Sequence, residues 1–476
     1  MTACLTEQAK AFSNRIVIVG YGTIGQCCLP MLLGELGFAH DRYTVIDGEE
    51  RAFAYRGTAI RYVVQHLEPD SLDEALRAYL QPGDILVNVS ISVDSVEVAD
   101  WCQRHDVLYV DSSIEPWVDD AWDESLPPAA RTEYAYHQAA RNHAAANWRR
   151  KGPTAVFSHG ANPGLVNHFV KAALLDVAAA VSMDVRTPGC REEWARLAQA
   201  TQTRVIHISE RDTQISTQPK RAGEFVNTWS IPGFVEEASM PVEIGWGTHE
   251  KTLPPGASHH ASGPRNAIYV PRAAAACQLR SWVPLGGPIL GLALPHSEAI
   301  TLSEYLTVRE GDVVRYRPTV AFAYLPCDAA LASLHEAMMR DWRLQRDWRV
   351  LNEDIADGRD ELGVLLFGHE LGGWWYGSQL DVHEARKLVP GNNPTAIQVA
   401  AGVVAAACWA MVNPKEGYCE VEELPHDRVL EVATPYLGPM VSRSTDWTPL
   451  KHRRPLFDEP WLDHDDPWQF GNFFVG

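Results

Sequence analysis

The chain has 476 residues, nine cysteines and a formal net charge of -20 at pH 7. Its length predicts two or three domains, and the hydrophobic fraction of 46% is typical of a folded protein with a large core. The negative charge argues against anionic partners, so we expect neither nucleic-acid nor membrane binding. Scattered cysteines without zinc-ligand spacing, and a short polar N-terminus without a signal peptide, predict a reduced, cytoplasmic protein.

The first predicted element is a buried strand over Ile16–Val19 that leads into a glycine-rich turn with the pattern G-x-G-x-x-G. Such glycines permit a tight turn, close approach of the backbone to a pyrophosphate, and close packing of the helix on the strand. The backbone N–H groups at the start of the next helix then hold the phosphates. From this turn we expect cofactor contacts by Gly20, Gly22, Thr23, Ile24 and Gly25.

A second strand is predicted at residues 44–46 and ends at Asp47. Dinucleotide-binding folds place an acid at this point to hydrogen-bond the ribose hydroxyls. A carboxylate here favours NAD over NADP because it repels a 2′-phosphate. The strand, the glycines and the acid together predict an NAD site, and an ordinary glycine turn is the alternative interpretation.

Strands and helices alternate through the first 160 residues. Further strands are predicted at 62–64, 85–89, 108–110 and 155–158, and helices at 73–80, 93–104 and, facing solvent, 129–150. This alternation predicts a parallel, doubly wound sheet of the Rossmann type, with ligands beyond the carboxyl ends of the strands. At those ends we expect further cofactor contacts from Asn88, Ser90, Asp111, Ser112, Ala161, Asn162 and Pro163.

The pattern changes after the first domain, which we place at residues 1–162. From 163 to 390, strand-like pieces such as 204–208 and 242–245 mix with loops rich in Gly and Pro, which predicts an inserted α+β second domain. The last part, 391–476, begins with an apolar helix that is too short to span a membrane comfortably. We expect this helix and the tail after it to return to the first domain. The predicted fold class is therefore α/β.

Acidic side chains and tryptophans are concentrated in the second domain. A carboxylate next to an indole face is suited to bind an ammonium group, since the cation–π interaction contributes roughly 0.5–2 kcal/mol when desolvated. Each candidate has a simpler interpretation as well. Glu210 fits a surface acid, Trp229 a core residue, His296 a capping or core histidine, and Asn162 a helix N-cap.

Several longer motifs extend through the chain. They are G-A-N-P-G at 160–164, I-H-I-S-E-R-D-T-Q at 206–214, N-T-W-S at 227–230, and further strings at 243–248, 360–366, 375–380, 445–450 and 466–470. Together with the glycine turn they span nearly the whole sequence, and they resemble the bacterial homospermidine synthases. Saccharopine reductase-like and carboxynorspermidine dehydrogenase-like proteins are the wider relatives that share the fold.

The resemblance implies a redox-neutral reaction of polyamine biosynthesis. Two putrescine molecules give sym-homospermidine and ammonia through imine intermediates, and NAD⁺ is consumed and regenerated within one cycle. The family positions imply catalytic roles for Asn162, Glu210, Trp229, Glu237 and His296, and substrate binding by Glu115, Asp360 and Trp229. They also imply a homodimer formed through the second domain, a monovalent cation such as K⁺ as a candidate cofactor, and spermidine or 1,3-diaminopropane as candidate further substrates.

Two other functions stay open at this point. A carboxynorspermidine or saccharopine-type NAD(P)-dependent reductase needs basic residues for a substrate carboxylate, whereas the motif residues are mostly acids and tryptophan. A non-catalytic NAD-binding regulator is compatible with the glycine turn alone, but the carboxylates of the second domain argue against it.

Overall fold

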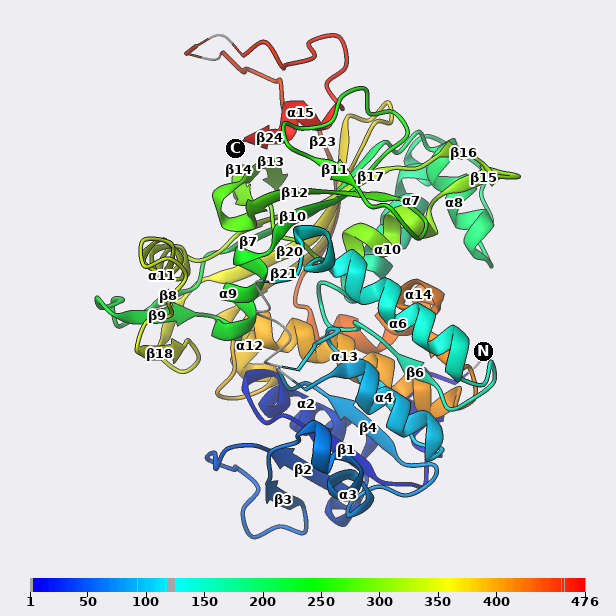
Figure 1. The fold of residues 1–476 in the computed structure, drawn as a ribbon, viewed down its shortest axis with the longest axis vertical. Coiled ribbons are helices and arrows are strands. Elements are labelled where there is room, and N and C mark those ends of the chain that lie inside the picture. The colour runs from blue at the N-terminus through cyan, green and yellow to red at the C-terminus, as the bar shows by residue number, and fades with distance from the viewer. Residues whose placement is uncertain (1–2, 92, 118–124, 455, 458, 476) are drawn as a thin grey trace.

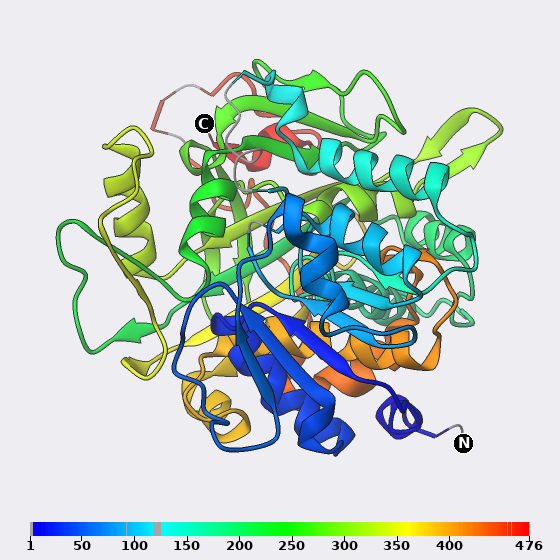
Figure 2. The same ribbon diagram turned by 60° about the horizontal axis from the view of Figure 1, so that its bottom comes forward.

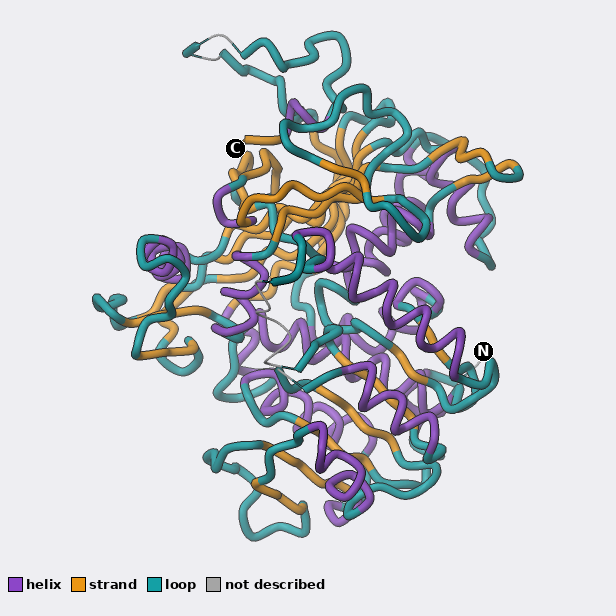
Figure 3. The backbone as a smooth tube through the Cα atoms, viewed as in Figure 1, coloured by secondary structure: helices purple, strands orange, loops and turns teal. Residues whose placement is uncertain are grey.

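Two groups of strands with helices between and around them form the protein (Figure 1; Figure 3). The structure is a computed structural model that describes residues 3–91, 93–117, 125–454, 456–457 and 459–475. The helices of this part of the chain are α1 (Leu5–Ala9), α2 (Thr23–Leu36), α3 (Leu72–Arg77), α4 (Ser95–Arg104), α6 (Glu133–Asn147), α7 (Leu165–Ala180), α8 (Arg191–Ala200), α9 (Ile231–Ser239), α10 (Ser297–Tyr305), α11 (Asp328–Met338), α12 (Val382–Leu388), α13 (Pro394–Val412), α14 (His426–Ala433) and α15 (Phe470–Phe473).

The first sheet has seven strands in the order β22-β6-β5-β4-β1-β2-β3, and every pair in it is parallel. This arrangement confirms the predicted doubly wound sheet. The strands are β1 (Ile16–Val19), β2 (Tyr43–Asp47), β3 (Arg61–Val64), β4 (Ile85–Asn88), β5 (Leu108–Asp111), β6 (Ala155–Val156) and β22 (Tyr418–Cys419).

Successive side chains of a strand point to opposite faces of the sheet. Both faces of this sheet are buried because helices pack on each of them. Ile16 and Ile18 of β1 belong to the core that also contains α2 and α13, whereas Val17 and Val19 pack with α3 and α4. Helix α6 lies over α4 and α10 and buries one of its own faces, including Tyr134. The expectation of a solvent-facing helix at 129–150 is therefore right for one face of α6 only.

The second sheet has eleven strands and is mixed, with its main path in the order β11-β12-β10-β17-β7-β20-β21-β23. Strand β7 runs parallel to β17 and antiparallel to β20, so these three strands form its centre. Helices α7 and α10 cover one face. The strands are β7 (Val205–Asp212), β10 (Pro241–Gly245), β11 (Ser258–His259), β12 (Ala267–Ala273), β13 (Gln278–Val283), β14 (Gly287–Leu292), β17 (Thr319–Leu325), β20 (Arg359–Phe367), β21 (Gly373–Asp381), β23 (Met440–Thr445) and β24 (Phe474–Val475).

Three two-stranded ribbons extend from this second sheet. They pair β9 (Glu224–Asn227) with β18 (Asp347–Val350), β8 (Ile215–Ser216) with β19 (Ile355–Asp357), and β15 (Val308–Glu310) with β16 (Val313–Tyr316). Strand β9 is followed by the short segment 228–230 and then by α9.

The chain returns to the first sheet after the second one is complete. Helix α13 packs against α2, β4 and β5, and β22 adds an edge strand to the first sheet (Figure 2). Helix α13 is long and apolar enough to cross a membrane by composition, yet 89% of its most apolar window is buried inside the protein.

The tail differs from the expectation that it also returns to the first domain. Strand β23 pairs with β21, and β24 pairs with β13, so the end of the chain belongs to the second sheet. The proposed boundaries at 162 and 390 stay a prediction.

Candidate active site

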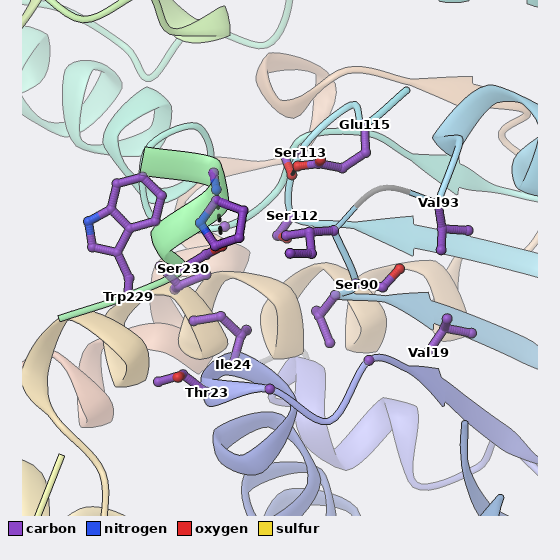
Figure 4. A pocket seen from close by; sticks show the side chains of 18 of the residues that line it. Val19, Thr23, Ile24, Ser90, Val93, Ser112, Ser113, Glu115, Trp229 and Ser230 are labelled. Carbon is purple, nitrogen blue, oxygen red and sulfur yellow. Dashed lines mark hydrogen bonds between the residues drawn. The ribbon is translucent and has the colours of Figure 1, made fainter. Parts of the chain in front are cut away.

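A cavity of about 1090 Å³ lies between the two sheets and is lined by residues of both (Figure 4). The first sheet contributes the glycine turn and the loops after β2, β4 and β5, and the second contributes β7, β17 and the start of α9. The lining includes fifteen of the predicted site residues, namely Gly20, Gly22, Thr23, Ile24, Asp47, Ser90, Ser112, Glu115, Ala161, Asn162, Pro163, Glu210, Trp229, Glu237 and His296. Gly25, Asn88, Asp111 and Asp360 lie behind this lining.

The glycine turn has the geometry that the sequence pattern requires. Gly20 has φ 94°, and a Cβ atom there would lie 2.7 Å from the backbone of the loop after β4. A Cβ on Gly25 would lie 2.1 Å from the carbonyl oxygen of Gly20, so the helix approaches the turn closely. A Cβ on Gly22 would meet no atom within 4 Å, because this residue faces the cavity.

Helix α2 begins at this turn without a side-chain cap. Its first backbone N–H groups, including those of Thr23 and Ile24, therefore have no intrahelical partner and lie at the cavity (Figure 4). A helix N-terminus of this kind attracts an anion. The turn and the helix start thus fit the pyrophosphate of a dinucleotide.

Asp47 at the end of β2 lines the cavity but also holds the surrounding backbone. Its carboxylate accepts hydrogen bonds from the backbone N–H of Tyr21 at 2.6 Å and of Glu49 at 2.8 Å, and from Nε of Arg51 at 3.1 Å. A carboxylate has room for about four donors, so one position is left for a ribose hydroxyl. The predicted role is compatible with these contacts.

Asn88 and Asp111 support the cavity wall from behind. The amide oxygen of Asn88 accepts the hydroxyl proton of Ser90 at 2.6 Å, so Asn88 orients a residue that does line the cavity. Asp111 accepts hydrogen bonds from the Tyr109 hydroxyl at 2.8 Å and the Ser158 backbone at 2.5 Å. Burial raises the pKa of Asp111 to about 8.

Three buried carboxylates lie side by side on β7 and β20. Asp360 is opposite Asp212 in the strand register, and Glu210 lies two residues before Asp212, on the same face of β7. Burial raises the pKa of each of the three, and repulsion from the neighbouring acids raises the pKa of Glu210 and Asp360 further. Nδ2 of Asn162 donates to Oε2 of Glu210 at 2.7 Å, and the Thr395 hydroxyl donates to Asp360 at 2.7 Å.

Asp212 was not among the predicted site residues, although the period of two along a strand places it on the face of Glu210. It accepts hydrogen bonds from the Thr228 hydroxyl and the Gln214 backbone N–H, both at 2.8 Å.

Trp229 forms part of an aromatic wall. It is half-buried, and its indole N–H donates to the Tyr324 hydroxyl at 3.4 Å. The centroid of its ring lies 5.4 Å from the ring centroid of Phe234. In Figure 4 Trp229 lies across the cavity from Ser113 and Glu115. The sequence offered no signal for Tyr324, because it lies nearly 100 residues from Trp229 in the buried strand β17.

His296 and Glu237 meet at the same end of the cavity. Nε2 of His296 lies 3.1 Å from Oε2 of Glu237, and Nδ1 lies 3.2 Å from Oε1 of Glu298. Burial alone would lower the pKa of His296, but the two carboxylates more than offset it and raise the pKa well above its usual value. Glu115 faces this end from the first sheet and accepts a hydrogen bond from Ser113 at 2.8 Å.

The charges of the lining are strongly asymmetric. Among the described lining residues, Arg51 at the glycine-turn end is the only lysine or arginine. The opposite end carries Glu115, Glu210 and Glu237 beside Trp229. Such a surface attracts a cationic ligand, and it lacks the basic side chain that a substrate carboxylate requires.

Comparisons with known proteins support the resemblance found in the motifs. Residues 16–156 match the family model described as Saccharopine dehydrogenase NADP binding domain, and residues 160–446 match the Saccharopine dehydrogenase C-terminal domain. A homospermidine synthase of Blastochloris viridis is 42% identical over 467 residues, which are 97% of this chain and 97% of that protein. One from Mesorhizobium japonicum is 40% identical over 470 residues, which are 97% and 96% of the two chains.

A solved structure extends the similarity to the fold. The homospermidine synthase of Legionella pneumophila, determined in complex with NAD, has a TM-score of 0.91 to this structure at 38% identity, and 98% of each chain is covered. The chain therefore belongs to the homospermidine synthase family of saccharopine dehydrogenase-like proteins.

Proposed function

We propose that the protein is a homospermidine synthase that converts two putrescine molecules to sym-homospermidine and ammonia with NAD as its cofactor. The observation that carries this proposal is the catalytic end of the cavity, where the carboxylates of Glu115, Glu210 and Glu237 and an indole face line the wall, whereas the one arginine of the described lining, Arg51, lies at the glycine-turn end. A diamine presents ammonium groups to such a wall. A saccharopine-type substrate, with carboxylates of its own, would be repelled.

The carboxylates supply the proton transfers. An amine must be neutral before it can lose hydride or attack an imine, so each cycle needs a base near the reacting nitrogen. Glu210 is suited to this task because burial and the negative charge of Asp212 raise its pKa toward that of a useful base at neutral to alkaline pH. Asn162 holds Glu210 in place, and Glu237 with His296 forms a second acid–base pair.

Trp229 covers the cationic centre. The ammonium and iminium forms of the substrate carry positive charge, which the π face of an indole stabilises when water is excluded. The hydrogen bond to Tyr324 and the contact with Phe234 fix the plane of the ring. Enclosure between two sheets also limits hydrolysis of the imine to 4-aminobutanal.

The glycine turn, Asp47 and Ser90 would hold the cofactor. When bound, NAD accepts two electrons from the first diamine and returns them to the new imine in the same cycle. We propose a preference for NAD over NADP because of Asp47. A homodimer, a cytoplasmic location, a dependence on K⁺, and use of spermidine or 1,3-diaminopropane remain predictions from the family resemblance.

Product analysis tests the function directly. The purified protein with NAD⁺ and ¹⁵N₂-putrescine should form homospermidine with three labelled nitrogens and an equal amount of labelled ammonia, as measured by mass spectrometry. Total NADH should stay below the enzyme concentration, because the electrons return to the product. Stoichiometric NADH without homospermidine would instead establish an amine dehydrogenase. Parallel reactions with spermidine, 1,3-diaminopropane, and added K⁺ or Na⁺ define the substrate range and the cation requirement.

A further inference from the structure

Glu298 is a buried carboxylate outside the cavity that contacts the imidazole of His296. Its exposed fraction is 0%, and it lies in the first turn of α10, two residues after His296, which is the N-cap residue of that helix. A helix N-terminus stabilises a carboxylate at this position. Oε1 faces Nδ1 of His296 at 3.2 Å, while Oε2 has no hydrogen-bond partner in the part of the chain that the structure describes.

The ring of His296 therefore lies between two carboxylates. Glu237 contacts Nε2 from the cavity side, and Glu298 contacts Nδ1 from the protein interior. A neutral imidazole has one N–H and one lone pair, so it cannot donate to both carboxylates. Two good hydrogen bonds require either an imidazolium or a neutral ring with the second proton on a carboxyl group. Both arrangements place two protons on the three groups.

These two arrangements differ only by the position of one proton. Glu298 does not contact the cavity, so the proton at Nδ1 has no substrate within reach. The proton between Nε2 and Glu237 lies at the cavity wall. We propose that Glu298 is a positioning residue that holds the Nδ1–H of His296, so that the exchangeable proton lies at Nε2 and passes between His296 and Glu237. This inference deepens the proposed function, on which it rests.

The surroundings of the ring fit this role. Phe322 of β17 packs against the imidazole with ring centroids 4.2 Å apart, which restricts rotation of the ring. Four carboxylates act on the charge of His296, and they come from separate elements: Glu133 of α6, Glu210 of β7, Glu237 of α9 and Glu298 of α10. Of these, Glu237 and Glu298 are hydrogen-bonded to the ring. Leaving one oxygen of Glu298 buried and unpaired costs stability, which suggests that the carboxylate is retained for function.

Glu298→Gln tests the proposal because it keeps the shape and removes the charge. The pKa of His296 should fall, so the alkaline limb of the kcat profile should move to lower pH by about one unit or more. At the wild-type optimum, kcat should fall about ten- to a hundredfold, which is less than the roughly 10²- to 10⁴-fold contribution of a complete acid–base group because His296 itself is still present. KM for putrescine and Kd for NAD⁺ should change less than about twofold, since Glu298 contacts neither site.

Glu243→Gln is the matched control. Glu243 is also buried in the second domain, and its Oε1 lies 2.9 Å from Nε2 of His260. It contacts neither His296 nor the cavity. This variant should keep the wild-type rate and pH profile, even if it is less stable. A Glu298→Gln enzyme with a wild-type profile would overturn the proposal, as would equal shifts in the two variants.

A double-mutant comparison separates positioning from a general structural effect. If Glu298 acts through His296, adding Glu298→Gln to His296→Gln should lower kcat less than about twofold further. If the fold decrease in kcat of the double variant equals the product of the decreases in the two single variants, the proposal is overturned.

A spectroscopic measurement decides the matter if Glu298→Gln does not fold. In wild-type protein labelled with ¹⁵N-histidine, the signals that disappear in His296→Gln identify this ring. Its Nδ1 should be protonated across the active pH range, and an unprotonated Nδ1 would overturn the proposal. This result does not depend on turnover, so a wild-type protein that makes no homospermidine would refute the proposed function and leave the test of Glu298 intact.

Discussion

The role of Trp229 can be separated from its packing by two substitutions. The ring is half-buried, lines the cavity and packs against Phe234. If its π face stabilises a cationic amine or iminium, Trp229→Phe should keep a weaker face and lower kcat about 2- to 30-fold, which corresponds to roughly 0.5–2 kcal/mol. Trp229→Ala removes the face and should lose most of the activity. Because one side of the ring faces the cavity, we expect the alanine variant to lose about 1–3 kcal/mol of unfolding free energy.

A purely structural tryptophan would behave differently, and Trp375 serves as the control. Trp375 is fully buried in β21, where its ring lies over Gly363 and Gly377. Trp375→Phe should lower the melting temperature and leave activity per folded molecule unchanged. If Trp229 were only core, its alanine variant would cost roughly 3–5 kcal/mol of stability with normal turnover.

The assay combines denaturant unfolding of each variant with homospermidine formation per NAD⁺-bound molecule. Trp229→Ala with the wild-type rate per folded molecule would refute the cation–π role and weaken the diamine assignment with it.

Three further predictions concern the cofactor and the electrostatics of the cavity. Asp47→Ala should weaken NAD⁺ binding by roughly 1–3 kcal/mol and reduce the preference over NADP⁺, whereas equal affinities of the wild type in calorimetry would contradict the role of this acid. Gly22→Ala should fold normally but lose NAD⁺ affinity, because the new Cβ would meet no protein atom within 4 Å and would enter the space for the cofactor. Gly25→Ala should lower the melting temperature as well, because its Cβ would lie 2.1 Å from the carbonyl oxygen of Gly20. Burial and two nearby carboxylates raise the pKa of Glu236 to about 8, so this group contributes stability that is present below its unfolded pKa of about 4.3 and is lost as the pH rises toward 8. Glu236→Gln should therefore unfold at a higher temperature than wild type at about pH 9 but not at about pH 4.5, and the same difference at both values in calorimetry would contradict the assigned shift.

The local features of the fold could be predicted from the sequence. The turn at Gly20 depends on the backbone conformations of a few adjacent residues, so the pattern of glycines specifies it without knowledge of the rest of the chain. The parallel sheet follows from alternating strands and helices, and the return of α13 to the first domain follows from a helix that is apolar on all sides and therefore needs a buried position. The motifs also indicated the family, which the comparisons confirm.

The arrangement of the site was decided by tertiary structure. Asp360 and Glu210 are 150 residues apart in the chain, and they lie close together only because β20 pairs with β7. The register of this pair also places Asp212 opposite Asp360. Asn88 and Asp111 lie behind the cavity wall, since whether a side chain at a strand end faces a ligand depends on the packing of its neighbours.

The tail and Glu298 show the same limit. A two-residue strand such as β24 has no periodic pattern, so its pairing with β13 depends on the surface available once the second sheet has formed. Glu298 stands two residues after His296 in the sequence, but only packing brings Glu237 of α9 to the other side of that imidazole ring. Local backbone preferences are encoded by neighbouring residues, whereas contacts between distant side chains exist only after strand register and helix packing have placed them.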